Sequence, residues 1–428
     1  MIIMKIFKLF IVSLFFFTSI FSEDSSSSPD SKKIDIYNEI YHFENDEALL
    51  KEILKVLENE HYLKKTYEEI RLDALKLYIK RLDPGKTIFL ENEIIIQEGR
   101  LDAQKTTISK DLKIAYKIFN LYKNRYIEKH NFQVTYLKLI NKESLNLDRQ
   151  IIRDREDMLR PQDINSLHTT WENLIINDLI QLVLSGNELE ESKSKISKRL
   201  NNQFNYFKQT REEDIFNIFS NSITNIYGPH TNYMSPKRSE DFDIDMSLSL
   251  EGIGALLSSD GMYTEISSLI AGGPAEKSGV LKPKDRIIGV AQSSEDEMTN
   301  IVGWRIDDVV KLIRGPKGSK VSMEIIPSTS LNDSNTREIE IVRNLVKLED
   351  QAAEKKILSK VRDADEYRIG VIKLPAFYFD FEAYQKKDYN YRSSSKDVKE
   401  LIKDLKKENV DGLIIDLRNN GGGSLYEA

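Results

Sequence analysis

Two glycine-containing segments are the parts of this sequence whose residue types suit chemistry. Residues 249–255 carry Gly252 and Gly254, and residues 418–424, Arg-Asn-Asn-Gly-Gly-Gly-Ser, follow the apolar run 413–417. Glycine lets a backbone turn sharply and approach a bound group, so that N–H groups can point at an anion. A phosphate loop is excluded at the second segment, because neither Gly-Lys-Ser/Thr nor a dinucleotide pattern is present. The backbone is therefore the predicted source of hydrogen-bond donors at both places.

Side chains offer few candidates for catalysis. The chain has no cysteine, which excludes disulfides, thiolate catalysis and cysteine-ligated metals. Its five histidines all precede the second glycine segment, and they are His42, His61, His130, His168 and His230. We interpret His230 as a turn residue with a satisfied hydrogen bond rather than as a catalytic base. Ser424 follows the glycines at a position that does not suit a nucleophile, so no role is assigned to it.

The size and charge of the chain limit its function. A length of 428 residues is enough for two or three domains. The net charge of −7 argues against a nucleic-acid-binding protein, which usually carries a basic surplus.

The N-terminus has the pattern of a secretory signal. Lys5 and Lys8 precede an apolar run over residues 9–21, and Ser22 leads into a polar segment. We expect cleavage after Ser22 and export to the periplasm. The alternative is an uncleaved inner-membrane anchor that faces the periplasm, although the run is shorter than the ~20 residues of a spanning helix.

The chain then changes character twice. From residue 34 to about 219 the apolar residues have helical spacing, as in Leu49, Leu50, Ile53 and Leu54, and glycine is sparse. Short alternating segments with two short helices, at 274–279 and about 304–314, follow up to Arg343.

The last part of the sequence predicts a strand–helix–strand unit. The strands are residues 369–374 and 413–417, and the helix begins near Ser393. The near-continuous apolar run 413–417 predicts a strand buried on both faces. Because the sequence stops soon after this strand, we expect the α/β core to be incomplete at Ala428.

Four segments in order resemble a PDZ domain of the bacterial protease type. They are residues 249–255, 271–280, 284–290 and 315–321. The resemblance implies a groove that holds a peptide's C-terminal carboxylate on backbone N–H groups while the peptide adds to the sheet as a strand. The expected groove residues are Leu250, Glu251, Gly252, Ile253, Gly254 and Ala255 of the loop, with Val309, Val310 and Ile313 of a facing helix.

Three further segments resemble the tail-specific, or C-terminal processing, serine peptidases of the long periplasmic Gram-negative type. They are residues 82–89, 229–236 and 413–423. The resemblance implies that a glycine of the last segment supplies an N–H group to the oxyanion hole, with Gly422 the best match and Gly421 the next. It also implies a Ser–Lys dyad downstream of this loop. Neither dyad residue can be assigned here, so we expect this chain to be inactive alone.

The predicted fold is therefore multidomain α+β. It comprises a helical N-terminal domain, a PDZ domain built as a small β-sheet barrel with two helices, and the start of an α/β peptidase core. The expected bounds are a signal peptide at 1–22, a linker at 23–33, the helical domain at 34–236, the PDZ domain at 240–345 and the peptidase core at 346–428.

The predicted function is a serine endopeptidase that recognises and degrades or processes the C-terminal tails of periplasmic proteins. The alternatives are a non-catalytic PDZ adaptor that binds C-terminal peptides and a helical interaction protein. Peptide tails are the expected partners, with a lipoprotein adaptor as a further candidate. We expect no cofactor, no metal, no nucleic acid and at most peripheral membrane contact.

Overall fold

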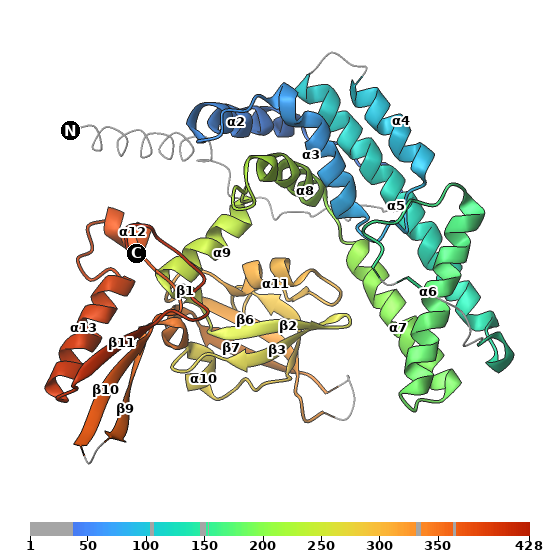
Figure 1. The fold of residues 1–428 in the computed structure, drawn as a ribbon. Coiled ribbons are helices and arrows are strands. Elements are labelled where there is room, and N and C mark those ends of the chain that lie inside the picture. The colour runs from blue at the N-terminus through green and yellow to red at the C-terminus, as the bar shows by residue number, and fades with distance from the viewer. Residues whose placement is uncertain (1–36, 103–106, 146–150, 153, 331–334, 363–364) are drawn as a thin grey trace.

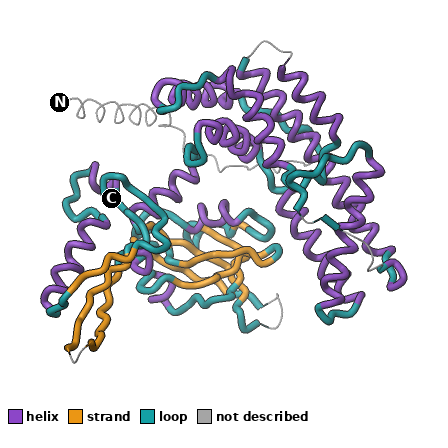
Figure 2. Tube along the Cα trace, viewed as in Figure 1, coloured by secondary structure: helices purple, strands orange, loops and turns teal. Residues whose placement is uncertain are grey.

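The computed structural model describes residues 37–102, 107–145, 151–152, 154–330, 335–362 and 365–428. The predicted signal peptide and linker lie outside the described residues. A helical region, a central β region and a smaller C-terminal sheet follow one another along the chain (Figure 1). The predicted multidomain α+β fold is confirmed, with helices gathered in the first half and strands in the second (Figure 2).

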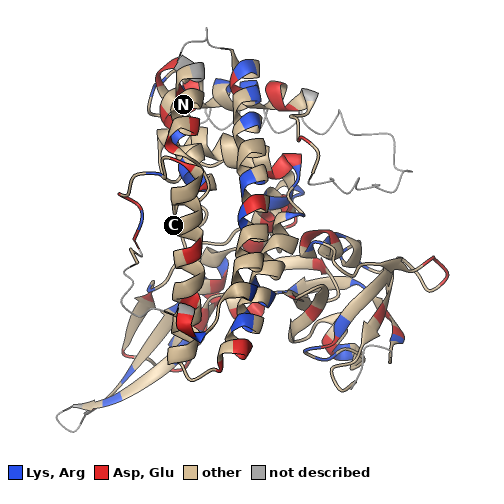
Figure 3. Cartoon of the chain, turned by 90° about the vertical axis from the view of Figure 1, so that its right-hand side faces the viewer, with Lys and Arg blue, Asp and Glu red and all other residues tan. Residues whose placement is uncertain are grey.

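The described residues of the N-terminal region form helices and the loops between them. Its α-helices are α2 (Glu44–Glu60), α3 (Tyr67–Leu82), α4 (Glu91–Asp102), α5 (Ile108–Leu139), α6 (Ile164–Leu184), α7 (Leu189–Phe207) and α8 (Glu212–Tyr227), with a short 3-10 turn η1 at Lys142–Ser144. Side chains on α2, α3, α5 and α8 form one apolar core, and the far end of α5 forms a second core with α6 and α7. Lysine, arginine, aspartate and glutamate alternate along the outer faces of these helices (Figure 3), as expected for solvated surfaces.

Helix α9 (Pro236–Ser247) connects the helical region to the β region. It begins where Ser235 accepts a hydrogen bond from the backbone N–H of Arg238, with Pro236 in the first turn. The helical spacing seen in the sequence ends near residue 219, so this helix was not predicted. It reaches β1 through Leu248, whose backbone adopts the left-handed conformation.

The β region holds a six-stranded sheet and the two short helices that the sequence predicts. Strands β2 (Ala255–Asp260), β3 (Tyr263–Leu269), β4 (Arg286–Ala291), β6 (Lys320–Ile326) and β7 (Arg337–Val342) lie in that order, with β5 (Thr299–Asn300) beside β4. A separate pair joins β1 (Ser249–Gly252) to β8 (Asn344–Lys347), and the helices are α10 (Pro274–Ser278) and α11 (Ile306–Ile313). Helix α11 packs its apolar face against this sheet, and both contribute to one core.

The C-terminal region contains the predicted strand–helix–strand unit. Strand β10 (Asp365–Lys373) pairs in parallel with β11 (Gly412–Asp416), and α13 (Ser394–Lys407) connects them. Strand β9 (Glu354–Arg362), which was not predicted, forms an antiparallel hairpin with β10; the 3-10 turn η2 (Glu349–Gln351) and α12 (Phe381–Gln385) complete the region. The prediction that this helix begins near Ser393 is confirmed, since the Ser393 hydroxyl caps it by accepting from the N–H of Lys396.

The predicted burial of residues 413–417 is wrong. Leu413, Ile414, Ile415 and Leu417 are between 42% and 50% exposed. Among the described residues, β11 pairs with β10 alone and forms the edge of a three-stranded sheet. An apolar run therefore predicted the strand correctly, although the neighbours that would bury both of its faces do not lie among these residues.

Candidate peptide groove and glycine loop

The first glycine segment contains, just before β2, two backbone donors without an acceptor among the described residues, at Ile253 and Gly254, which are both buried; the side chain of Ile253, predicted for the groove, belongs to the core. The carbonyl of Ile253 accepts from the N–H of Ala275 at 2.8 Å, and the carbonyl of Gly254 accepts from the N–H of Ile270 at 2.9 Å. Within the part of the chain that the structure describes, the N–H groups of Ile253 and Gly254 have no acceptor. Two adjacent unpaired donors in a turn can hold a carboxylate, as the sequence predicts.

Close packing fixes the backbone at Gly254. Its φ of 75° is left-handed, and a Cβ there would lie 3.1 Å from Cα of Gly273 and 3.3 Å from the side chain of Val346. A larger residue would therefore strain the fold of the β region rather than simply fill a groove. Gly252 differs, because it lies in β1 and its Cβ would face Arg314 at 3.8 Å.

The predicted helical wall of the groove needs correction. Val309 is completely buried and Ile313 is 4% exposed, and both belong to the core of the β region. Only Val310 of the three predicted wall residues is half-buried and open to a ligand in this structure. The spacing of an apolar stripe on α11 identified a packed face, which is the usual reason for such a stripe.

The loop residues differ in their access. Leu250 and Ala255 are half-buried, and the exposed Glu251 accepts from the backbone N–H of Lys317 at 3.2 Å. Leu256, on the next position of β2, is 54% exposed and was not among the predicted residues. The alternation of β2 is the signal that could have found it, since Ala255 and Leu257 pack against the core on the other face.

The second glycine segment is held by internal hydrogen bonds. The N–H of Gly421 donates to the carbonyl of Pro375 at 3.0 Å, and the N–H of Gly422 donates to Oδ1 of Asn420 at 2.8 Å. The Asn420 amide in turn donates to the carbonyl of Leu374 at 2.9 Å. Both predicted oxyanion donors are thus engaged, and Gly422 would be released only if the Asn420 side chain moved.

Gly423 emerges as a further donor that the sequence analysis missed. Its N–H has no acceptor within the described ranges, and its neighbours Gly422 and Ser424 fasten the loop to Phe377 through two bonds of 2.8 Å. A Cβ on Gly423 would lie 2.4 Å from the carbonyl oxygen of Phe377, so only glycine permits this approach. The roles of Gly421 and Gly422 in an oxyanion hole stay predictions.

A lysine and a hydroxyl meet in the helical region, but in the wrong place for catalysis. Nζ of Lys129 lies 2.9 Å from Oγ1 of Thr87, and burial lowers the pKa of Lys129 to about 8. Thr87 is buried, and its carbonyl accepts from the indole N–H of Trp171 at 2.7 Å. A peptide carbonyl cannot reach a hydroxyl packed in this way, so the pair belongs to the scaffold.

The segment 82–89 is the centre of that scaffold. The buried carboxylate of Asp83 accepts from the N–H groups of Thr87, Ile88 and Phe89 at 2.7, 3.2 and 3.2 Å. It also pairs with the guanidinium of Arg160. This polar centre joins α3 to the segment that leads into α6.

Three further features bear on the class of function, namely the side chain of His230, metal-binding groups and membrane-spanning helices. His230 lies in a turn as predicted, but its side chain is exposed and has no hydrogen-bond partner among the described residues, so the predicted satisfied hydrogen bond is wrong. The described ranges contain no group of three or more histidine or acidic side chains that could hold a metal ion. The same ranges contain no helix with the length and apolar character needed to span a membrane.

Three family descriptions match the chain in order. Residues 53–237 match the tail specific protease N-terminal domain, residues 241–326 match the PDZ domain, and residues 368–428 match peptidase family S41. Together they follow the succession of helical region, β region and C-terminal sheet seen in the structure.

Relatives with known names agree with these matches. The Tail-specific protease of Haemophilus influenzae is 36% identical over 371 residues, which are 85% of this chain and 50% of the relative. The Carboxy-terminal processing protease CtpA of Bacillus subtilis is 30% identical over 226 residues, or 52% of this chain and 41% of the relative. The PDZ domain of a carboxy-terminal protease from Vibrio cholerae, solved with a peptide, is 50% identical and covers 24% of this chain and 100% of that one, with a TM-score of 0.22.

The chain spans 50% and 41% of the lengths of these two curated relatives. The matches nonetheless extend from the helical region to the second glycine segment. The chain belongs to the family of tail-specific and carboxy-terminal processing proteases.

Proposed function

We propose that this protein is a serine endopeptidase of the Ser–Lys dyad type that grips the C-terminal tails of periplasmic proteins and degrades or processes them. Family membership supports peptide-bond hydrolysis as the reaction. The arrangement of the groove supports a chain end as the feature that is recognised, since free N–H groups are better suited to a carboxylate than to an internal peptide group.

The observation that carries the proposal is the pair of unpaired donors at Ile253 and Gly254. Each residue's carbonyl is already engaged, so the donors alone are left for a ligand. The half-buried side chains of Leu250 and Val310 offer apolar contacts for the last residues of a tail. Burial of such side chains contributes about 25 cal/mol of binding free energy per Å² of apolar surface. Hydrogen bonds to the carboxylate fix the orientation of the bound peptide.

Catalysis in this proposal depends on backbone N–H groups of the loop 421–423. A tetrahedral oxyanion needs donors about 2.7–3.1 Å away, and glycine allows a substrate carbonyl to come that close. Gly423 offers an unengaged N–H, and Gly422 would offer a second one if Asn420 turned away. The serine and the lysine are not assigned to any residue of this chain.

The 428 residues by themselves should hydrolyse no peptide bond. Ser424 is 8% exposed, and the lysine–hydroxyl pair at Lys129 and Thr87 is enclosed in the helical region. Oxyanion donors stabilise a transition state, but they supply no attacking group.

The experiment compares this chain with the Tail-specific protease of Haemophilus influenzae, of which its match covers 50%, and with a chimera that joins this chain to the unmatched part of that relative. All three are incubated with an unfolded protein that ends in apolar residues, and cleavage is followed by mass spectrometry. We expect cleavage by the relative and by the chimera but not by the 428 residues alone. A chimera that binds the tail without cleaving it would favour the PDZ adaptor, whereas cleavage by the 428 residues would contradict the assignment of the dyad to other residues.

A further inference from the structure

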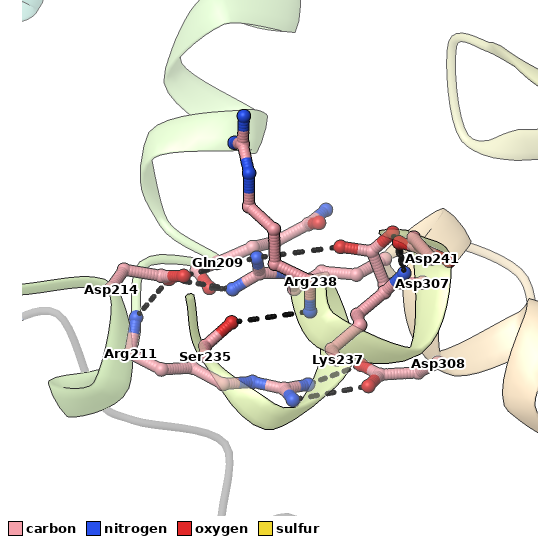
Figure 4. A network of polar contacts seen from close by, with 10 residues as sticks. Gln209, Arg211, Asp214, Ser235, Lys237, Arg238, Asp241, Asp307 and Asp308 are labelled. Atoms are coloured by element: carbon pink, nitrogen blue, oxygen red, sulfur yellow. Dashed lines mark hydrogen bonds and ion pairs between the residues drawn. The ribbon is translucent and has the colours of Figure 1, made fainter. Parts of the chain in front are cut away.

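The helical region and the β region meet through charged groups rather than through a shared core. The apolar core clusters of the helical region contain no residue of the β region, and the core of the β region contains none from the helical region. Their contact joins α8 and α9 to the outer side of α11 (Figure 4). A polar contact of this kind permits relative motion of the two domains, because their separation exposes little apolar surface to water.

Two reciprocal arginine–carboxylate pairs form the centre of this contact. Arg305 in the β region donates to both carboxylate oxygens of Asp214 of α8, from Nη1 at 2.6 Å and from Nη2 at 3.2 Å. Arg211, just before α8, binds both carboxylate oxygens of Asp308 on α11, with Nη1–Oδ1 at 3.1 Å. Each region thus supplies one arginine and one aspartate. Both pairs are bidentate, a geometry that makes arginine–carboxylate contacts directional.

Weaker contacts surround the two central pairs. Lys237 of α9 lies 3.2 Å from Asp307 of α11, and Nη1 of Arg314 lies 3.4 and 3.3 Å from Glu240 and Asp241 of α9. On the side of the β region they involve Asp307, in the first turn of α11, and Arg314, the residue that follows the helix. We call Arg211, Asp214, Arg305 and Asp308 the clamp.

Solvent reaches the clamp. Its four side chains are between 19% and 35% exposed, and they line a cavity of about 490 Å³ with other charged residues of α8, α9 and α11. Ions can therefore enter the contact, and the Debye length falls from about 10 Å at 0.1 M to about 3 Å at 1 M salt. Attraction between partly solvated charges weakens steeply over this range.

We propose that the clamp is a releasable latch that holds the PDZ domain against the helical domain and restrains the solvent side of α11. Val309 and Ile313 hold the other side of this helix in the core whether or not the latch is closed. Release removes the restraint on the solvent side, so α11 can adjust to a bound tail and the groove becomes easier to enter. Tail binding and docking then oppose each other, as linkage requires. The effect on tails rests on the proposed function, whereas the docking itself does not.

The test measures docking directly. The chain has no cysteine, so Lys198→Cys on α7 and Ser259→Cys on β2 place a donor and an acceptor dye on exposed sites of the two regions. Energy transfer is recorded at about 0.05 M and about 0.5 M NaCl, a range over which screening changes severalfold. We expect high transfer at low salt and lower transfer at high salt.

Charge reversal distinguishes the latch from a general effect of charge. Asp308→Arg should lower transfer at both salt concentrations, and adding Arg211→Asp should restore it at low salt by recreating the pair in the opposite sense. The matched control is Glu340→Arg, which makes the same charge change at a pair with Lys320 inside the β region and should behave as the unmodified protein. Unchanged transfer in Asp308→Arg, or no recovery in the double variant, would overturn the latch.

A second arm tests the coupling to tails. A peptide with apolar final residues and a free carboxylate should bind the Asp308→Arg variant about fivefold more tightly or better, which is the lower end of usual couplings. Equal affinities for the variant and the unmodified protein would overturn the coupling. If every variant bound the free-acid peptide and its amide equally while transfer responded as expected, the tail-binding function would fail and the latch would stand.

Discussion

Replacing Gly423 by alanine should loosen the second glycine loop, whereas the same change at Gly421 should not. A Cβ on Gly423 would lie 2.4 Å from the carbonyl oxygen and 2.8 Å from the carbonyl carbon of Phe377, and its φ of 138° disfavours any side chain. A Cβ on Gly421 meets nothing within 4 Å, and its φ is not positive. The two variants thus differ in strain and not in composition.

The expected destabilisation of the loop in Gly423→Ala is the sum of two separate free-energy costs. Backbone strain of this kind is worth about 1–3 kcal/mol, and forcing an extra carbon into packed surroundings adds about 1–3 kcal/mol. Even the lower end of the sum, about 2 kcal/mol, changes a local opening equilibrium roughly 30-fold. The bonds that open are those that fasten Phe377 to Gly422 and Ser424.

Hydrogen exchange followed by mass spectrometry measures this opening. Peptides that contain Phe377 and Ser424 should exchange about 30-fold faster or more in Gly423→Ala, and at the unmodified rate in Gly421→Ala. Peptides from β9 provide an internal reference in each sample. Equal protection in the two variants would show that the approach of Gly423 to Phe377 does not hold the loop.

Further predictions concern other parts of the chain. Asp111→Ala should destabilise the helical region by about 3–5 kcal/mol in thermal unfolding, because it leaves Arg71, 7% exposed, without its partner; wild-type stability would refute this. Arg343→Met should cost more than about 3 kcal/mol in the β region, since the Arg343 guanidinium binds three backbone carbonyls and two side chains; a loss below 1 kcal/mol would refute this. Expression with the native N-terminus should yield a protein that begins at Glu23, whereas an intact Met1 in the membrane fraction would favour the anchor.

The broad architecture could be predicted because local pattern and fold agree. Helical spacing identified the first region, alternation identified the strands of the second, and Ser393 marked the start of α13. These signals depend on residues a few positions apart in the chain, so they are visible in the sequence itself. The same is true of the glycine segments, since their backbone conformations require glycine at Gly254 and Gly423.

Details that depend on distant neighbours could not be predicted. The apolar stripe of α11 contains Val309 and Ile313, but a stripe does not reveal whether core or ligand covers it. The N–H of Gly421 donates to the carbonyl of Pro375, which no spacing in the chain indicates. The bond from Gly422 to Asn420 is local, and the Asn-x-Gly spacing could have suggested it.

The clamp illustrates the same limit over a longer distance. Its pair of Arg211 and Asp308 spans 97 positions of the chain, between two segments that have no local pattern in common. Charge patterning reveals pairs within a helix, such as Lys51 with Glu47, but not pairs between domains. Such contacts become visible only when the two regions are placed together.

Most directly testable is our proposal that the groove beside Ile253 and Gly254 recognises the C-terminal carboxylate of a polypeptide chain. The most direct test titrates the protein with two peptides of identical sequence and apolar final residues, one with a free carboxylate and one amidated, by fluorescence anisotropy. We expect micromolar or weaker binding of the free acid, because a flexible tail loses conformational entropy on docking. The amidated peptide should bind more weakly by about 1–3 kcal/mol, because the N–H groups of Ile253 and Gly254 then have no charged acceptor. Equal affinities would contradict the recognition of a chain end and with it the proposed function.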